Sequence, residues 1–239
     1  MIGSPLEGET LWQIGPVPIS SAVVVTWVIM LVLVLGARLA TARLALRPSR
    51  RQAALELLVD TLDTQIRETM QADPAPYRAL IGTLFVYVLV ANWSSLVPGV
   101  EPPTARLETD AALAGIVFAA TIVYGLRVHG VRGYLASFAE PGLLMVPLNL
   151  VEQITRIFSL MVRLFGNVVA GVFVVGIALS LAGLFVPIPF MALELLIGAI
   201  QAYIFSVLAM VFIGAAVYQE PAAAAGHEPS SPTNRREHP

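Results

Sequence analysis

An arginine stands in the middle of the longest apolar stretch of this sequence. The stretch runs from about Leu143 to Val186 and contains no proline between Pro147 and Pro187. It is far longer than the roughly 20 residues that a helix needs to cross a bilayer. Arg163 keeps its charge at any ordinary pH, and such a charge at membrane depth costs about 3 kcal/mol or more. An ionisable residue in this position marks a functional site by default, so Arg163 is the first candidate.

The composition is that of a membrane protein. Of the 239 residues, 57% are hydrophobic and only 13% are charged, which is more apolar than a soluble core requires. The chain has no cysteine, which excludes disulfides, zinc thiolate sites and thiol nucleophiles. Its net charge of −2 gives no reason to expect nucleic acid as a partner. No catalytic constellation or glycine-rich phosphate loop is present, so we expect neither a soluble enzyme nor a bound cofactor or metal.

Five apolar segments predict five membrane helices, over residues 20–39, 78–97, 111–126, 143–186 and 190–218. A cluster of arginines follows the first of them at once: Arg38, Arg43, Arg47, Arg50 and Arg51. Positive charge stays in the cytoplasm, so this cluster predicts an extracytoplasmic N-terminus and a cytoplasmic C-terminus. Residues 1–19 then form an extracytoplasmic tail, and the Ala-, Pro- and Ser-rich residues 219–239 form a disordered cytoplasmic one.

Residues 52–72 have a different pattern from the five spans. Apolar residues recur at helical spacing against acidic and basic ones, which predicts an amphipathic helix too polar to span. Such a helix either lies at the cytoplasmic membrane interface or packs as a surface helix on a partner. The predicted fold is therefore an all-α polytopic membrane protein with a single membrane domain, 20–218. It has five membrane segments plus an interfacial amphipathic helix, and the last two segments form a long tilted helical hairpin.

Polar residues on the last two segments fall on particular faces. At 100° per residue, five of them lie within an arc of about 80°: Glu152, Arg156, Ser159, Arg163 and Asn167. On the final segment, Glu194 and Gln201 share one face two turns apart. Arg156 and Glu152 are spaced to form an internal ion pair, and Asn167 and Gln201 could serve only to hydrogen-bond a neighbouring helix. Arg163 and Glu194 instead indicate an ion or proton path.

Several motifs resemble subunit a of F-type ATP synthases. VRLFGN contains Arg163 and is followed by AG, and LIGAIQAYIFSVLAMVFIGAAV carries Gln201 at the family's glutamine. ANWSSLVPG, PPTARLETDAALA and PLNL are further matches, in the expected order along residues 20–217. The resemblance implies a non-catalytic stator subunit of the bacterial inner membrane. Its partners would be the c-ring and b-type stalk subunits, and ATP would be made on other subunits.

In that family, two tilted helices face the rotating c-ring, and two offset half-channels deliver ions to the ring carboxylates and collect them. The resemblance implies that the ion-translocating residues are Arg163, Glu194, Gln201 and Asn167. Channel-lining or supporting roles fall to Arg156, Glu152, Asn149, Ser159 and Asp110. The transported ion is a proton or Na⁺, and the choice between them lies mainly in the c subunit.

The sequence also departs from the family pattern. Val172 occupies a position after AG where many members carry an acidic residue, and Asn149 stands where glutamate is frequent. The usual PTADLN reads PTARLE, with Arg106 and Glu108 as the changed residues. These departures leave room for a divergent branch such as the sodium-linked N-ATPases.

Two other classes of protein fit this sequence less well. A secondary ion transporter or channel could use an intramembrane Arg and Glu pair, but such transporters usually contain two related halves. The first three segments of this chain do not resemble the last two. A scaffold protein would need no arginine or glutamate at membrane depth.

Overall fold

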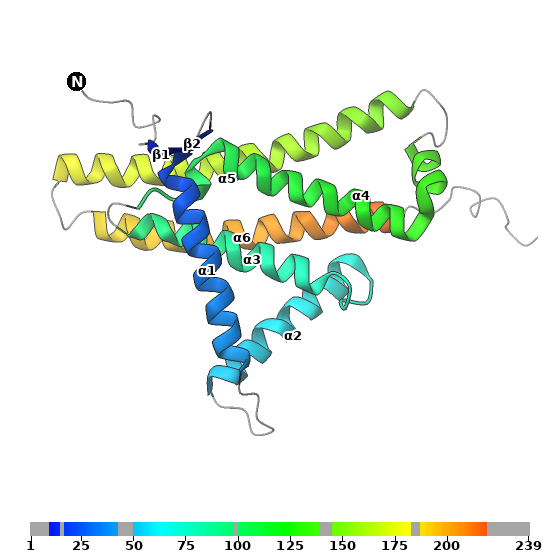
Figure 1. Ribbon diagram of the computed structural model, residues 1–239, viewed down its shortest axis with the longest axis horizontal. Helices are drawn as coiled ribbons and strands as arrows, with labels where there is room; N and C mark the ends of the chain where they lie inside the picture. Colours follow the sequence, from blue (N-terminus) through cyan, green and yellow to red (C-terminus); the bar gives the residue numbers. More distant parts are fainter. Residues whose placement is uncertain are drawn as a thin grey trace, which may run out of the picture.

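The computed structural model describes residues 10–14, 17–42, 50–97, 100–138, 145–182 and 187–218. These residues form two strands, β1 (Thr10–Ile14) and β2 (Val17–Ser20), and six α-helices (Figure 1). The helices are α1 (Ser21–Thr41), α2 (Arg50–Met70), α3 (Arg78–Trp93), α4 (Leu107–Phe138), α5 (Met145–Ala182) and α6 (Pro187–Val217). Two short 3₁₀ helices, η1 (Ser94–Leu96) and η2 (Pro103–Ala105), flank the loop between α3 and α4.

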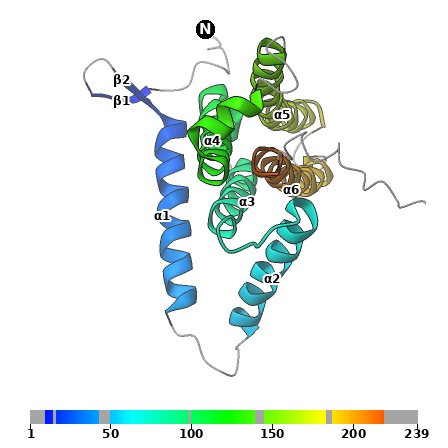
Figure 2. The same cartoon turned by 90° about the vertical axis from the view of Figure 1, so that its right-hand side faces the viewer.

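Five of the helices are long and apolar enough to cross a membrane: α1, α3 extended through η1, α4, α5 and α6. This confirms the predicted class, a helical polytopic membrane protein. Figure 1 shows that α3, α4, α5 and α6 lie side by side, whereas α1 stands across them. In Figure 2, α1 and α2 diverge as the two arms of a V. Helices α5 and α6 pack on each other as the predicted long hairpin.

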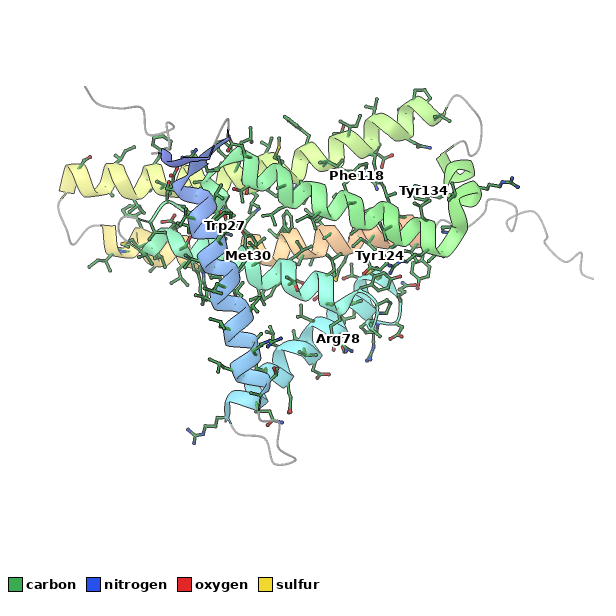
Figure 3. All side chains as sticks on the ribbon, in the orientation of Figure 1. Trp27, Met30, Arg78, Phe118, Tyr124 and Tyr134 are labelled. Atoms are coloured by element: carbon green, nitrogen blue, oxygen red, sulfur yellow. The ribbon has the colours of Figure 1, made fainter. Side chains whose placement is uncertain are left out.

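The core forms where α6 meets the helices around it. Phe205, Met210 and Ile213 of α6 are almost fully buried, as are Ile81 and Val88 of α3. Ala202 and Ala209, both at 0% exposure, are the small residues that let helix backbones approach closely within a membrane. Helix α1 by contrast exposes a row of large apolar side chains, including the labelled Trp27 and Met30 (Figure 3). Helix α6 is therefore the central element of the fold.

Helix α4 is longer than the predicted span 111–126 and is kinked near its end. Gly130 has φ of 68° and ψ of 169°, a conformation that interrupts the helix and that side chains with a Cβ rarely adopt. Beyond the kink, the chain turns back and Tyr134 packs as a buried residue. The predicted span ends at residue 126 because the polar residues Arg127, His129 and Arg132 follow. In the structure, the helix continues through these residues.

The hairpin helices also begin and end at slightly different residues from those predicted. Helix α5 covers 145–182 rather than 143–186, and α6 begins at Pro187 rather than at residue 190. Pro187 and Pro189 thus lie in the first turn of α6. Proline is tolerated there because the first amide groups of a helix have no carbonyl partner within it.

Residues 1–19 were predicted as a tail, and their described part contains a β-hairpin instead of irregular chain. Strand β1 pairs antiparallel with β2, with Thr10 opposite Ser20 and Ile14 opposite Val17. The predicted disordered segment 219–239 lies outside the described residues.

Helix α2 covers most of the predicted amphipathic segment 52–72 and packs on its own chain. Its buried residues Ile66 and Met70 join the core formed with α3 and α6. The carboxylate of Asp63 forms a bidentate ion pair with the guanidinium of Arg78 at the start of α3. Hydrogen bonding to Arg78 holds the pKa of the Asp63 carboxyl below its ordinary value. Leu57 remains exposed at 67%, so α2 also keeps an apolar surface of its own.

Candidate functional site

Arg163 lies on the exposed side of α5. Among the residues that the structure describes, Arg163 takes part in none of the ion pairs. The next residue, Leu164, is fully buried, so α5 packs on the other helices through one face and presents Arg163 on another. Arg163 lines a groove of about 380 Å³, which we call the arginine groove. Its lining is Glu152, Thr155, Arg156, Ser159, Leu160 and Arg163 of α5 with Leu208 and Phe212 of α6.

An ion pair joins two residues in the N-terminal half of the predicted polar stripe. Arg156 donates a hydrogen bond to the Glu152 carboxylate one turn earlier. Its guanidinium carbon also lies 5.4 Å from the centre of the Phe212 ring, within cation–π range. The ion pair that the four-residue spacing predicted is therefore formed, and it includes a contact with α6 that the spacing did not predict.

A second hollow adjoins this ion pair, between α4, α5 and α6. This inner cavity measures about 190 Å³ and is lined by both polar and apolar groups. Its lining is Thr121, Tyr134, Asn149, Glu152, Gln153, Arg156, Phe212, Ala215 and Ala216. Tyr134 reaches it because the kink at Gly130 turns the end of α4 back toward α5 (Figure 3).

Glu194 and Asn167 come together in a different cavity, at the other end of the stripe. This Glu194 cavity measures about 180 Å³ and brings α3, α5 and α6 together. Gly171 of α5 makes room for the carboxylate, since a Cβ at that position would lie 2.8 Å from Glu194 Oε1. Asn92 of α3 donates a hydrogen bond from Nδ2 to the Gly198 carbonyl at 3.1 Å and borders the same space.

The largest hollow lies on the side of the loop between α3 and α4. This outer cavity of about 600 Å³ is bordered by Ser95, by residues 100–102 and 105–108, and by one face of α5 from Phe165 to Ser180. Arg106 forms an ion pair with Glu101 at 3.0 Å within its wall. The Ser95 hydroxyl donates a hydrogen bond to the Asn92 carbonyl at 2.8 Å, so a residue that borders the outer cavity contacts a residue that lines the Glu194 cavity. Val172 lines the outer cavity and not the space around Glu194.

Two of the predicted site residues are buried elsewhere. Gln201 is 6% exposed and its Nε2 has no hydrogen-bond partner among the described residues. Asp110 is fully buried in the first turn of α4, where neither carboxyl oxygen has a hydrogen-bond partner in the described part of the chain. Neither residue lines the arginine groove or the three cavities. Their roles in translocation stay predictions.

The sequence did not single out some residues that line these hollows. Asn92 and Ser95 are polar residues near the end of an apolar span, and this signal could have marked them as candidates. Phe212 gave no comparable signal because one aromatic residue in an apolar helix is ordinary. Tyr134 was placed outside the predicted spans and enters the site only through the kink at Gly130.

The hollows are distributed along α5 in two groups. The inner cavity and the arginine groove contact α5 between residues 149 and 163. The Glu194 cavity and the outer cavity contact it from residue 165 onward. Arg163 stands between the two groups, on a helix that is long enough to span a bilayer. These features define a helical membrane protein in which ionisable side chains of the apolar helices α5 and α6 line hollows between the helices.

Comparisons with known proteins identify the family. Residues 22–214 match the family model described as ATP synthase A chain. The chain is 56% identical over 217 residues to "ATP synthase subunit a 2" of Bradyrhizobium sp. strain BTAi1, covering 91% of this chain and 97% of that protein. It is 44% identical over 207 residues to "ATP synthase subunit a" of Albidiferax ferrireducens, covering 86% and 90% respectively. The chain belongs to the ATP synthase A chain family.

Proposed function

We propose that this chain is the stator subunit a of a rotary ATP synthase in a bacterial inner membrane. In this role, two offset half-channels carry ions to and from the carboxylates of a c-ring, with Arg163 at the rotor interface. The chain carries no ATP chemistry of its own, since synthesis and hydrolysis belong to other subunits. Its partners are the c-ring and the b-type stalk subunits.

The position of Arg163 is the observation that carries this proposal. The side chain is exposed on α5, and none of the ion pairs found among the described residues includes it. Hollows whose linings include polar side chains lie along the helix on both sides of it. An unpaired guanidinium at membrane depth is costly. A ring carboxylate that arrives at Arg163 would relieve that cost by supplying the missing partner.

Electrostatics gives the arginine two effects at this interface. A nearby cation favours the ionised form of a carboxylate, so a ring carboxyl that meets Arg163 releases its ion. The same fixed charge repels ions that would pass directly between the two groups of hollows. An ion that cannot take this short path has to travel on the ring, and rotation results. The membrane potential supplies about 2.3 kcal/mol per charge per 100 mV for this movement.

We propose the outer path to run through the outer cavity and the Glu194 cavity. Ser95 supports this connection because it borders the outer cavity and donates a hydrogen bond to the carbonyl of Asn92, which lines the Glu194 cavity. We propose the inner path to run through the inner cavity toward the arginine groove, with Glu152 and Arg156 between them. With the N-terminus outside, the start of α5 faces the cytoplasm, which is consistent with this assignment.

The test of the proposal is ion-driven ATP synthesis by the whole complex in reconstituted vesicles. We expect Arg163→Lys to abolish coupled synthesis, because a buried lysine can lose its proton and presents a different geometry from a guanidinium. Arg127→Lys is the matched control. Arg127 lies over the Tyr124 ring at 5.8 Å and borders none of the hollows described here, so this variant should retain synthesis. Near wild-type synthesis by Arg163→Lys would overturn the assignment of the arginine.

A further inference from the structure

Three side chains border both the inner cavity and the arginine groove. They are Glu152, Arg156 and Phe212. Every other residue that lines the inner cavity, including Asn149 and Tyr134, is absent from the lining of the groove. The boundary between the two hollows is therefore made of one carboxylate, one guanidinium and one aromatic ring.

The guanidinium of Arg156 is held on two sides within this boundary. Glu152 binds it from the preceding turn of α5, and the Phe212 ring lies 5.4 Å away on α6. Arg156 is also partly shielded from solvent, with 35% of its side chain exposed. A long side chain with two contacts from two helices keeps one position, unlike a free surface arginine.

The position of Arg156 along α5 adds a second fixed charge to the path. Arg156 precedes Arg163 by seven residues, or about 10.5 Å along the helix at 1.5 Å per residue. A guanidinium does not lose its proton at ordinary pH, so the charge is permanent. Glu152 offsets part of this charge on one side of the guanidinium, and the uncharged Phe212 ring lies on another. A hydrated metal cation that passes on the Phe212 side would be repelled at close range. A proton can instead move through the carboxylate of Glu152 and hydrogen-bonded water beside it.

We propose that Arg156 is a charged partition between the inner cavity and the arginine groove, which excludes hydrated cations and lets protons pass by Glu152. The proposal rests on the function proposed above and deepens it, because it assigns ion selectivity to the inner path of this chain. In the transfer, the Glu152 carboxylate accepts a proton from a hydronium ion on one side and returns it to a water molecule on the other, which regenerates the carboxylate that pairs with Arg156. Arg156 is a positioning residue in this scheme, and Phe212 holds it in place.

Single thiols can test the partition because the native chain has no cysteine. Ser159→Cys places a thiol in the arginine groove, beyond Arg156, and Asn149→Cys places one in the inner cavity, before it. The whole complex is held in vesicles with its cytoplasmic face outward. The reaction rate of each thiol is measured with a cationic and a neutral thiosulfonate reagent of similar size.

We expect the thiol introduced by Ser159→Cys to react slowly with the cationic reagent and readily with the neutral one. Adding Arg156→Gln should raise the ratio of the cationic rate to the neutral rate about tenfold, because the repulsion of the cationic reagent is removed and the neutral reagent reports any change in the thiolate fraction. Adding Arg156→Lys should keep the cationic rate low. The thiol from Asn149→Cys should react with both reagents in every background. Arg127→Gln removes a comparable arginine from a cation–π contact and should change nothing.

Three results would overturn the partition. The first is a cationic rate that Arg156→Gln leaves unchanged, and the second is an equal rise for both reagents, which indicates a steric plug. The third is the absence of any reaction at the Ser159→Cys thiol, which means that the groove does not communicate with the inner cavity.

If Arg156→Gln fails to assemble, Glu152→Gln with Arg156→Gln removes both charges and leaves no unpaired carboxylate. If the Asn149→Cys thiol is unreactive from the cytoplasm, the proposed inner path fails together with the partition.

Discussion

At the scale of single residues, Gly171 and Glu194 depend on each other. The Glu194 side chain lies so close to Gly171 that a Cβ there would be 2.8 Å from Oε1 and 3.1 Å from Cδ. A methyl group at residue 171 would therefore displace the carboxylate from its cavity. The glycine is needed here for space between two helices, as in many close helix contacts within membranes.

We predict that Glu194→Gln and Gly171→Ala both slow ion flux through the reconstituted membrane sector. The first removes the titratable group, and the second moves it away from Asn167 and Asn92. Flux should fall sharply in Glu194→Gln and by a smaller factor in Gly171→Ala, and the complex should still assemble with its ring. Gly115→Ala is the control, because a Cβ at Gly115 meets no atom within 4 Å. Flux that neither variant alters would show that the outer path runs elsewhere.

Ionisable candidate residues could be named from the sequence, whereas the residues that surround them could not. Arg163 and Glu194 stand out because charges are rare in apolar helices, and helical spacing was enough to pair Arg156 with Glu152. The spacing could not show that Phe212 closes over Arg156, since that contact depends on the register between α5 and α6. It also could not show that Gln201 faces the packed interior instead of the arginine groove.

At the scale of elements, a set of hydrogen bonds around Glu101, which we call the Glu101 tie, connects the loop between α3 and α4 to α1. Arg106 donates two hydrogen bonds to Glu101, at 3.0 and 3.1 Å, and Ser21 at the start of α1 donates a third at 2.7 Å. Burial raises the pKa of the Glu101 carboxyl, but these hydrogen bonds outweigh it and bring the pKa below its ordinary value. The changed residue Arg106 thus acquires a structural partner within the same loop.

We predict that this tie stabilises the protein at neutral pH and not in acid. A carboxyl whose folded pKa lies below its unfolded pKa contributes stability above the unfolded value, and the contribution disappears as pH falls through the folded value. Thermal unfolding of the purified complex should show Glu101→Gln less stable at pH 7, by about 1 kcal/mol or less. The difference from wild type should begin to shrink as pH falls below the ordinary glutamate pKa of about 4.3 and should vanish below the lower folded pKa.

Two comparisons complete that measurement. Glu108→Gln, which removes an exposed carboxylate in the first turn of α4 beside this loop, should have little effect at either pH. Arg106→Gln should destabilise about as much as Glu101→Gln, and the double variant should add little more. If Glu101→Gln remains less stable than wild type in acid, then side-chain packing, and not the charge of Glu101, holds the loop to α1.

Hydropathy predicted the helical elements well because length and apolar content define a membrane span. It did not predict the kink at Gly130, where a single backbone conformation redirects α4. The β-hairpin was also missed, since two short strands in a proline-containing segment carry little pattern. Pro187 and Pro189 were interpreted as a break, although both fit the first turn of α6.

At the scale of the whole molecule, α1 stands across the other membrane helices (Figures 1 and 2). If α1 crosses the bilayer along its normal, then α5 and α6 are steeply tilted and present a long flank to a rotor. The arginine bias of the sequence sets the proposed orientation, with the loop between α3 and α4 outside. The sequence alone would suggest Thr104 in that loop as the position for a thiol probe of membrane sidedness. Thr104 is fully buried, so the probe has to be placed at an exposed residue.

The two-sided ion path is tested most directly by labelling single thiols from each side of the membrane. Ser180→Cys places a thiol in the outer cavity, and Asn149→Cys places one in the inner cavity. With the assembled complex in sealed vesicles of each orientation, an impermeant thiol reagent should modify the first only from outside and the second only from the cytoplasm. Modification of both thiols from the same side would contradict two half-channels separated at Arg163.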